Sequence, residues 1–378
     1  MRVLMLSKAL VVGAYQKKCE ELARLPGVEL RVVVPRFWAE AGRKMYLERR
    51  YTGGYDLVVR RMVLNGHFHV HFYPGFGAEV RGFKPDIVHL DEEAYNLATA
   101  HGLWVSRRAK AKTVFFTWQN IYRELPFPFS ALERYCLNNV DYAIAGNAAA
   151  VDILLKKGLR KPTTIIPQFG VDPDLYSRQR VSRAAIPGVE PTNGQRPFVI
   201  GYVGRIVPQK GLMGLLEAVA GLDGDWRLVF LGDGPLRPEL EVRAHQSGVF
   251  DRVVFIPSVS SVDVPSYLVA LDVLVLPSLT TPSWKEQFGR VLIEAMACEV
   301  PVVGSDSGEI PNVIGDAGLV FREGEIGELR ARLRQLMESQ SLCARLAEAG
   351  RQRVLRVYTQ KAVAEATYRV YEELLGTV

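Results

Sequence analysis

Two glutamates, Glu286 and Glu294, lie eight positions apart in a segment whose residue types could bind a substrate. Apolar side chains repeat at helical spacing from Val291 to Met296, which predicts Glu286 in a loop just before a helix and Glu294 inside that helix. Because a helix rises about 1.5 Å per residue, the two carboxylates could contact two points of one ligand roughly 10 Å apart. We expect each carboxylate to accept hydrogen bonds from hydroxyl groups of that ligand.

The predicted start of this helix offers backbone N–H groups at Phe288 and Gly289, between the two glutamates. Helix N-termini favour phosphate because unpaired N–H groups and the helix dipole both point at it, and Gly289 allows a ligand to approach the backbone. The segment therefore predicts an anion site flanked by hydroxyl-bearing groups. Two glutamates alone would also be typical of a solvated surface helix.

A second candidate segment follows a predicted strand that ends near Tyr202. It contains Gly204, Arg205, Lys210 and Gly211 ahead of a helical pattern. Arginine offers a planar fork for bidentate phosphate binding and lysine a mobile point charge, so the pair suits a diphosphate. The alternative is an ordinary strand-to-helix turn with surface charge. The chain has neither a G-x-x-x-x-G-K-[ST] sequence nor a G-x-G-x-x-G sequence after a strand, which disfavours P-loop and dinucleotide sites.

Composition indicates a large globular chain. Of 378 residues, 48% are hydrophobic and 23% charged, with no run of about 18 apolar residues and no cleavable signal pattern, so we expect a cytoplasmic protein. The four cysteines are scattered, without the close pairs of a zinc site. Through residue 180 there are 27 Lys and Arg against 17 Asp and Glu, so the amino-terminal half is the basic half.

This basic balance, which includes Arg107, Arg108, Lys110 and Lys112, favours acidic partners such as anionic lipid headgroups. We expect a peripheral contact with an anionic membrane at its inner face. The clusters lack interleaved aromatic residues, so nucleic acid is not an expected partner. Ordinary solvated surfaces remain the alternative.

Short apolar runs alternate with helical patterns along the chain, which is typical of parallel sheets covered on both faces. The pattern fails between Asp172 and Arg196, where turn formers and polar residues gather. We therefore predict an α/β protein with a domain at 1–175, a linker at 176–197 and a second domain at 198–359. The predicted strands are Val3–Leu6, Leu30–Val34, Asp86–Leu90, Thr113–Phe116, Tyr142–Ala145, Thr163–Ile166, Phe198–Tyr202, Leu228–Leu231, Val253–Ile256, Val273–Leu276, Pro301–Val303 and Leu319–Phe321.

Ligands in such sheets bind at the carboxyl ends of strands, so we expect two doubly wound, Rossmann-like domains facing a central cleft. Gly232, at the end of a predicted strand, would lie on the same edge as Arg205 and Glu286. The amphipathic pattern at 360–378 predicts a C-terminal helix that packs back onto the first domain.

Several short motifs occur in one order between Gly201 and Phe321, and the ordered set resembles the carboxyl-terminal domain of retaining nucleotide-sugar glycosyltransferases of family 4, which have the GT-B fold. The motifs are Gly204-Arg205 with Lys210-Gly211, Gly232-Asp-Gly-Pro235, Leu276-Pro-Ser278, Glu286-Gln-Phe-Gly289 with Glu294-Ala-Met-Ala297, and Pro301-Val-Val303. Before Asp172 the resemblance extends only to the alternation of strands and helices.

The resemblance implies roles for the matching residues. Arg205 and Lys210 would hold the donor diphosphate together with backbone groups at Gly204, Gly232, Phe288 and Gly289. Glu294 would bind the ribose hydroxyls and Glu286 would orient the donor sugar. With Glu286, Arg205 and Lys210 as the catalytic set, cations and helix N–H groups would stabilise the departing diphosphate without a metal ion or cofactor.

The amino-terminal domain gives weaker signals for an acceptor site. The histidine that family members often carry after the fourth strand is absent, and this chain has Trp118, Gln119 and Asn120 there. Trp118 could stack on a sugar or pack in the domain core. Gly13, after the first strand, and Asp91, after a later one, are further acceptor-side candidates. His67, His69 and His71 alternate at strand period, which favours the polar side of a half-buried strand over a metal site.

The sequence thus predicts a retaining, hexosyl-type glycosyltransferase that takes a UDP- or GDP-linked donor and a glycan or lipid-linked saccharide acceptor. An epimerase or phosphorylase of the same fold is the first alternative, because it would also act on the sugar–phosphate bond. A non-catalytic sugar-nucleotide-binding subunit is the second.

Overall fold

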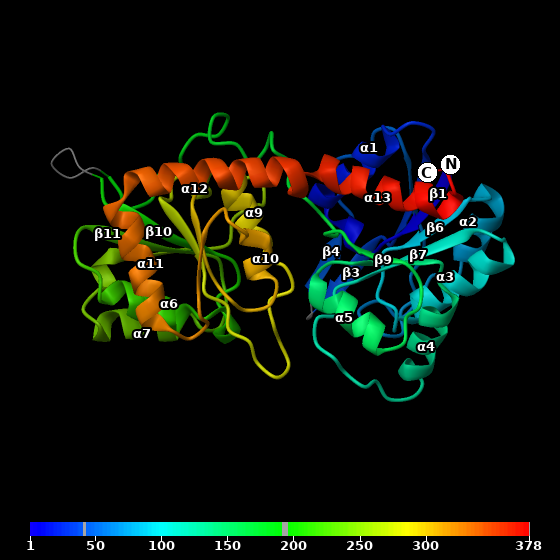
Figure 1. Cartoon of the computed structure of the whole chain (residues 1–378), viewed down its shortest axis with the longest axis horizontal. Helices are drawn as coiled ribbons and strands as arrows, with labels where there is room; N and C mark the ends of the chain where they lie inside the picture. Colours follow the sequence, from blue (N-terminus) through cyan, green and yellow to red (C-terminus); the bar gives the residue numbers. More distant parts are fainter. Residues whose placement is uncertain (41–42, 191–195, 378) are drawn as a thin grey trace. The chain divides into compact units, whose positions relative to one another are not determined.

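The computed structural model describes residues 1–40, 43–190 and 196–377. Its contacts divide the chain into two compact units (Figure 1). The first unit comprises Met1–Gly170 with Gln360–Val378, and the second comprises Val171–Thr359. Among the described residues, no helix combines the length and apolar character needed to span a membrane.

The described part of the first unit contains a seven-stranded parallel sheet in the order β5-β2-β1-β6-β7-β8-β9. The strands are β1 (Arg2–Leu6), β2 (Glu29–Val34), β5 (Asp56–Val59), β6 (Ile87–Leu90), β7 (Lys112–Thr117), β8 (Tyr142–Ala145) and β9 (Thr163–Ile165), with a separate hairpin of β3 (Phe37–Glu40) and β4 (Arg43–Tyr46). The helices are α1 (Lys17–Ala23), α2 (Phe76–Phe83), α3 (Leu97–Arg108), α4 (Phe129–Asn139), α5 (Ala148–Lys156) and α13 (Gln360–Leu375).

The second unit contains a six-stranded parallel sheet in the order β12-β11-β10-β13-β14-β15. The strands are β10 (Phe198–Val203), β11 (Trp226–Leu231), β12 (Val253–Ile256), β13 (Val273–Leu276), β14 (Val302–Ser305) and β15 (Leu319–Phe321). The helices are α6 (Leu212–Ala220), α7 (Arg237–Gln246), α8 (Val264–Leu268), α9 (Arg290–Ala297), α10 (Ile310–Ile314), α11 (Ile326–Glu338) and α12 (Gln340–Arg353), and short 3₁₀ turns include η3 (Pro208–Lys210).

All twelve predicted strands are confirmed, with ends that differ by a few residues. The central strands were readable because strands buried on both faces are continuous apolar runs. The sequence prediction missed edge strand β5, whose side chains are only half-buried, and the β3–β4 hairpin. The predicted strand at His67–Phe72 is wrong, because residues 68–70 form a turn and the Nδ1 atom of His71 lies 3.3 Å from the His67 carbonyl oxygen.

The described residues of the expected linker belong by their contacts to the second unit. Tyr176 and Ile186 are buried there, and the N–H of Ala184 donates to the Ser266 carbonyl at 2.9 Å. The division between the units falls instead at Gly170–Val171 and at Thr359–Gln360. A segment rich in turn formers can therefore be packed along most of its length.

Helix α13 (red in Figure 1) contributes to the core of the first unit. Val363, Ala364 and Tyr371 lie in one apolar cluster with Cys19 and Leu22 of α1 and with residues of β1 and β2. The Tyr371 hydroxyl lies 2.6 Å from Nδ1 of the buried His89 on β6. The C-terminal segment and the first strands therefore form one folded body.

In both sheets the first strand of the unit lies inside the sheet. The chain first adds strands on one side of it and then crosses over to add strands on its other side. In the second unit this switch point lies between β10 and β13, and in the first unit between β1 and β6. The carboxyl ends of strands beside a switch point are where doubly wound sheets bind ligands. The residues that follow β10, β13, β1 and β6 are therefore the first candidates for function.

Candidate functional site

In the second unit, glycines let the loops at the carboxyl edge approach one another closely. Gly204 follows β10 and Gly232 follows β11, with φ angles of +148° and +142°. A Cβ atom on Gly232 would lie 2.0 Å from the carbonyl oxygen of Gly204. A side chain at position 232 would clash with this carbonyl group, so only glycine fits there. The backbones of Gly204 and Gly232, both predicted as donor-site residues, therefore lie in close contact at this edge.

Lys210 and Glu286 form an ion pair beside the switch point. The Lys210 Nζ atom lies 2.5 Å from Glu286 Oε2, and the Ser278 hydroxyl donates to the same oxygen at 2.8 Å. Gly211, with φ +69°, brings this loop against β13's end, since a Cβ there would lie 1.9 Å from the Pro277 carbonyl oxygen. Ser278 is a site residue that the sequence analysis noted only within a motif, because its partner lies eight residues away in an irregular loop.

The pair is mostly buried, with side-chain exposures of 15% for Lys210 and 11% for Glu286. The Lys210 ammonium also lies 5.0 Å from the centre of the Trp284 ring. The Glu286 backbone is fixed as well, because its carbonyl accepts from the Glu309 N–H at 3.2 Å. A partly desolvated cation and carboxylate therefore stand preorganised at the sheet edge.

Helix α9 begins at Arg290, after Gly289 in the left-handed region with φ +78°. This confirms the predicted helix, with Glu286 before it and Glu294 inside it. Phe288 is buried and its ring contacts Tyr358. No acidic residue occupies the first turn of α9, so its N–H groups and dipole can act on an anion.

Glu294 is buried inside the second unit, with 8% of its surface exposed. Its Oε1 atom lies 2.8 Å from Nε of Arg290, and the Tyr176 hydroxyl also hydrogen-bonds to this carboxyl. Burial raises the pKa of Glu294, while the Arg290 charge and the two hydrogen bonds oppose the rise. Tyr176 is a site residue that sequence reasoning assigned to the linker.

Arg205 is exposed at the end of β10. Its backbone carbonyl accepts a hydrogen bond from the Tyr202 hydroxyl at 2.7 Å, which fixes the loop and not the guanidinium. The structure thus gathers Gly204, Gly232, Lys210 and Glu286 at one edge and leaves the Arg205 side chain in solvent. An exposed arginine at such an edge is available to an incoming anion.

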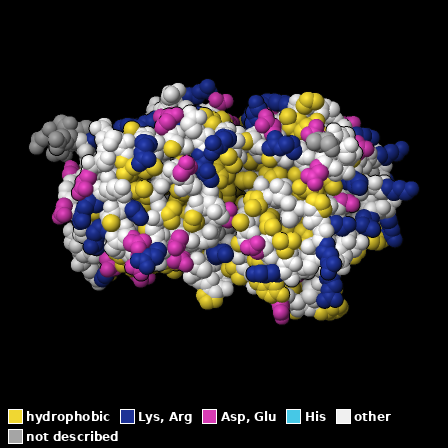
Figure 2. Space-filling model, in the orientation of Figure 1, with side chains coloured by type: hydrophobic (Ala, Val, Ile, Leu, Met, Phe, Trp, Pro, Cys, Tyr) yellow, Lys and Arg dark blue, Asp and Glu magenta, His cyan; other side chains and the backbone are white. Residues whose placement is uncertain are grey.

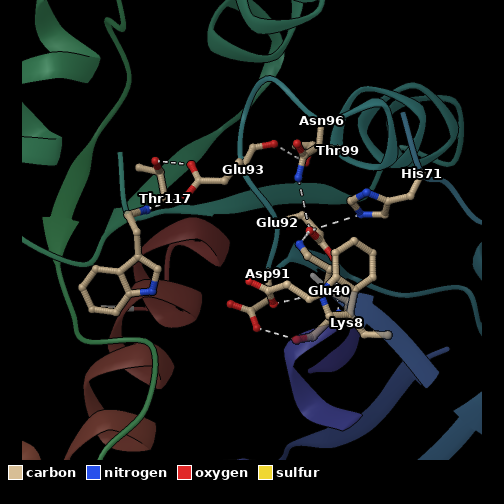
Figure 3. Close-up of polar contacts among 12 residues, drawn as sticks. Lys8, Glu40, His71, Asp91, Glu92, Glu93, Asn96, Thr99 and Thr117 are labelled. Atoms are coloured by element: carbon tan, nitrogen blue, oxygen red, sulfur yellow. Dashed lines mark hydrogen bonds and ion pairs between the residues drawn. The ribbon is translucent and has the colours of Figure 1, made fainter. Parts of the chain in front are cut away.

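In the first unit, three consecutive acids follow β6, and each is held differently (Figure 3). Asp91 accepts from the Ser7 hydroxyl at 2.6 Å and from the Gln168 amide at 2.9 Å. Burial raises the pKa of Asp91, and the Lys18 ammonium opposes this rise. Asp91, an acceptor-side candidate, is therefore an internal hydrogen-bond acceptor in this structure.

Glu92 forms an ion pair with Lys8, lies 3.5 Å from Nε2 of His71 and accepts from Asn96 at 3.3 Å (Figure 3). Burial alone would raise the pKa of Glu92, but the charge of Lys8 and the contacts with His71 lower it to about 2. Lys8 and Glu92 were not among the site residues predicted from the sequence. The only signal was an acid directly after a strand, and its partner lies 84 residues away.

Glu93 accepts from the Thr117 hydroxyl at 2.5 Å and from the Trp118 N–H at 2.8 Å. Burial raises the pKa of Glu93 to about 7, while these hydrogen bonds oppose the rise. Thr117 ends β7, so Glu93 joins the carboxyl ends of β6 and β7. It fixes the start of the loop that carries the acceptor-side candidates.

The other acceptor-side candidates are anchored too. Gln119 accepts from the Lys157 ammonium at 3.4 Å, and Asn120 is buried. The Gly13 N–H donates to Glu48 at 2.9 Å, and a Cβ on Gly13 would lie 2.7 Å from the same carboxylate oxygen. Gly13 therefore serves the packing of the loop after β1 in this structure.

Comparisons with known proteins cover both sequence and fold. Residues 188–353 match the family model "Glycosyl transferases group 1". The chain is 30% identical over 183 residues to 2-deoxystreptamine glucosyltransferase of Streptomyces kanamyceticus, which is 47% of this chain and 46% of that protein. It is also 30% identical over 191 residues to a GDP-mannose-dependent phosphatidylinositol monomannoside mannosyltransferase of Mycolicibacterium smegmatis, which is 49% of this chain and 48% of that protein.

These matches span about half the length of the curated relatives. Among solved structures, Anabaena Alr3699/HepE in complex with UDP has a TM-score of 0.75 at 20% identity, covering 99% of this chain and 100% of that one. This likeness confirms the GT-B type of fold. The chain thus has the GT-B fold of two Rossmann-like units, and its residues 188–353 match the Glycosyl transferases group 1 model.

Proposed function

We propose that this protein is a glycosyltransferase that moves a hexosyl group from a nucleotide-diphosphate donor to a hydroxyl of a glycan or lipid-linked saccharide. The observation that carries the proposal is the Lys210–Glu286 pair at the switch point of the second sheet. The pair lies within the segment that matches the Group 1 family model. A cation and a carboxylate at a ligand-binding edge suit a substrate that joins a phosphate to a sugar.

In this proposal the donor diphosphate lies between Lys210, Arg205 and the start of α9. The exposed Arg205 can bind a phosphate in a bidentate manner, and α9 begins directly after Gly289 and has no acid in its first turn. A UDP- or GDP-linked donor is supported by the neighbours, since the HepE structure holds UDP and the mycobacterial relative is named for GDP-mannose.

The two glutamates bind different parts of the donor molecule. Glu294 accepts hydrogen bonds from the ribose hydroxyls. It lies one turn inside α9 and is held by Arg290 and Tyr176. Glu286 orients the sugar hydroxyls, and Ser278 keeps it aimed when Lys210 turns to the phosphate. Lys210 thus exchanges one carboxylate partner for the diphosphate.

Charge development explains how these groups would accelerate transfer. The leaving diphosphate gains negative charge as the sugar becomes oxocarbenium-like, so fixed cations and helix N–H groups stabilise the transition state more than the bound substrate. Lys210, Arg205 and α9 can supply this stabilisation without a metal ion. We propose retention by front-face attack, in which a donor phosphate oxygen takes the proton of the acceptor hydroxyl as the new glycosidic bond forms.

The test begins with thermal stability in the presence of UDP, GDP, ADP and their sugars, because a ligand that binds the folded state raises the unfolding temperature. Turnover of the best donor is then measured with and without saccharide acceptors, and the anomeric configuration of the product is read by NMR. Acceptor-dependent turnover with retained configuration supports the proposal. Donor consumption that needs no acceptor would point to an epimerase or phosphorylase, and tight binding without turnover to a binding subunit.

We also propose that the protein contacts an anionic membrane at its inner face through α3. The first unit carries 27 Lys and Arg against 18 Asp and Glu. Figure 2 shows many Lys and Arg side chains on the surface of the molecule. At the end of α3, Arg108 stacks 3.6 Å from the exposed Trp104 ring, beside the exposed residues Arg107, Lys110 and Lys112. Basic residues around an interfacial tryptophan suit anionic lipid.

Vesicles with and without phosphatidylglycerol test this contact. Binding should require the anionic lipid, weaken with salt and fall when Arg107, Arg108 and Lys110 are changed to Gln. Changing Lys156, Arg160 and Lys161 to Gln removes equal charge elsewhere on the first unit and serves as the control. Equal loss in both triple variants would show that only net charge matters and that α3 is not the contact surface.

A further inference from the structure

Trp118 is held at the carboxyl edge of the first sheet by two hydrogen bonds from different directions. Its backbone N–H donates to Glu93 at 2.8 Å, and its indole N–H donates to the Gln168 side chain at 2.9 Å. Gln168 lies after β9 and in turn donates to Asp91 after β6. Three strand ends therefore fix both the backbone and the ring of one tryptophan.

The ring itself rests on glycine. A Cβ atom on Gly146, which follows β8, would lie 2.1 Å from Cε3 of Trp118, so any larger residue would push the indole away. Phe116 contacts the ring edge-on at a centroid distance of 5.2 Å. Trp118 is half-buried and packs against the apolar cluster of the first unit that contains Phe116 and Ile144.

The acids beside Trp118 are compensated, as Figure 3 shows for Glu92 with Lys8 and His71. Asp91 has the buried Lys18 ammonium nearby as well as its two hydrogen-bond donors. Glu93 accepts only from uncharged donors among the contacts described, and its raised pKa limits its charge near neutral pH. This edge therefore presents a rigid aromatic face in surroundings of little net charge.

We propose that Trp118 is a stacking platform for a neutral pyranose ring of the acceptor, and that Glu93 and Gln168 are positioning residues that hold the platform. The inference rests on the proposed function and names the acceptor class for it. A pyranose offers an apolar C–H face to an indole, and a ring that is already fixed loses little conformational entropy when it binds. Because the charges of these acids are already balanced or reduced, the acids would not add to the affinity for a charged acceptor.

Glu93 also makes the platform depend on pH. The charged groups that face its carboxyl are Lys8 and Glu92, with the Tyr95 hydroxyl nearby. Above a pH of about 7 the carboxylate can accept from both Thr117 and Trp118, whereas the protonated form has one oxygen that is itself a donor. The affinity for the acceptor should therefore rise as the pH increases through 7.

Binding is tested with methyl α-D-glucopyranoside, methyl α-D-mannopyranoside and methyl α-D-galactopyranoside on the full chain. The signal is the difference in tryptophan fluorescence between wild type and Trp118→Phe, since the chain has five tryptophans. Because Trp118→Ala removes this reporter, its effect is measured as the acceptor KM, which should rise about tenfold, the value of one aromatic contact. Glu93→Gln and Gln168→Leu keep the reporter and should weaken binding less, whereas Val242→Ala, at an exposed position of α7 in the second unit, should not change it.

Kinetics separate this inference from the proposed function. In the variants at Trp118, Glu93 and Gln168, the KM for the acceptor should rise while nucleotide affinity stays unchanged, and the pH dependence of that KM should disappear in Glu93→Gln. Wild-type turnover with no change of acceptor KM in any variant would overturn the platform alone. Absence of any saccharide-dependent turnover or saturable fluorescence response in wild type would instead overturn the proposed function and the platform with it. A tighter response to methyl α-D-glucosaminide would overturn the neutral class.

Discussion

The Lys210 ammonium and the Ser278 hydroxyl are among the groups that hold Glu286 before any donor binds. Glu294 is held by Arg290 and Tyr176 in a separate set of contacts. Both glutamates and Lys210 were predicted from their residue types and spacing. Ser278 and Tyr176 could not be predicted as partners, since a hydroxyl near a loop gives no periodic signal.

The separate contacts predict different effects for the two glutamates. In Glu286→Gln, turnover should fall by about 10²- to 10³-fold because the sugar is no longer oriented in the transition state. Nucleotide affinity should stay within about threefold, since Lys210 loses a competing carboxylate and remains available to phosphate. Calorimetric titration with the nucleotide and initial-rate kinetics measure the two effects.

Glu294→Gln should behave in the opposite way and weaken nucleotide binding by about tenfold or more, as expected for hydrogen bonds to a charged group. Arg290→Gln is the matched variant, because it removes the ion pair and leaves the carboxylate. If Glu286→Gln weakened the nucleotide and Glu294→Gln affected only turnover, the two roles would be reversed.

The buried Glu93 predicts a contribution to the pH dependence of stability. Its pKa is raised from 4.5 to about 7 in the folded protein, so the folded state binds more protons than the unfolded state between these pH values. The free energy of unfolding should therefore fall as pH rises from 4.5 to 7, by up to about 3 kcal/mol from this group. Urea unfolding across this range should show a flatter profile in Glu93→Gln, whereas Glu29→Gln, at an exposed position, should keep the wild-type profile.

At the scale of elements, the start of α9 connects sequence to site most directly. The helical repeat predicted the helix, but the left-handed conformation of Gly289 and its contact with β13 depend on the fold. A Cβ on Gly289 would lie 2.8 Å from a Leu276 methyl group, at a φ of +78°. Gly289 thus sets both the helix start and the distance between α9 and the sheet.

Gly289→Ala should destabilise the second unit by about 1–3 kcal/mol, because the backbone is strained and Leu276 must move. It should also weaken nucleotide binding, since the first N–H groups of α9 shift. Gly327→Ala, in α11 with no atom within 4 Å of the new Cβ, is the control and should be neutral or slightly stabilising. Thermal unfolding and nucleotide titration of both variants check this, and equal effects would show that the position of α9 is not important.

The twelve predicted strands are all present, including the edge strands β9, β12 and β15, whereas edge strand β5 and the β3–β4 hairpin were not predicted. The central strands β6 and β13 are buried along their whole length, and β1 is buried from Val3 to Leu6, so these strands read as apolar runs. Edge strand β5 is half-buried and begins with Asp56, so its pattern does not differ from that of a polar loop. The histidines at positions 67, 69 and 71 alternate with apolar residues, yet this segment forms a turn. A period of two over so few residues is therefore weak support for a strand.

At the scale of the whole molecule, α13 makes the first unit discontinuous in sequence. Its buried residues Val363 and Tyr371 complete the apolar cluster beneath α1, and Tyr371 contacts His89. Without this helix, Cys19 and Leu22 of α1 would face water. The chain ends of the first unit therefore depend on each other for stability.

Deletion of residues 360–378 should unfold the first unit and leave the second unit folded, because each has its own core and sheet. Hydrogen exchange followed by mass spectrometry should lose protection in β1, β2 and β6 and keep it in β10, β11 and β13. Deletion of residues 376–378 alone should have no such effect, since Gly376 is exposed. Retained protection of β1 in the longer deletion would contradict a structural role for α13.

The sequence by itself determined the alternation of strands and helices, the two-unit fold class and the ordered motifs of the second unit. These are local properties, since burial on both faces and helical periodicity are recorded in neighbouring residues. Only the tertiary structure decided which side chains meet. Lys210 meets Glu286 across 76 positions and the Lys8 backbone meets Glu92 across 84, because the register of parallel strands brings distant loops to one edge. That register depends on the packing of whole sheets and helices, which no short stretch of sequence encodes.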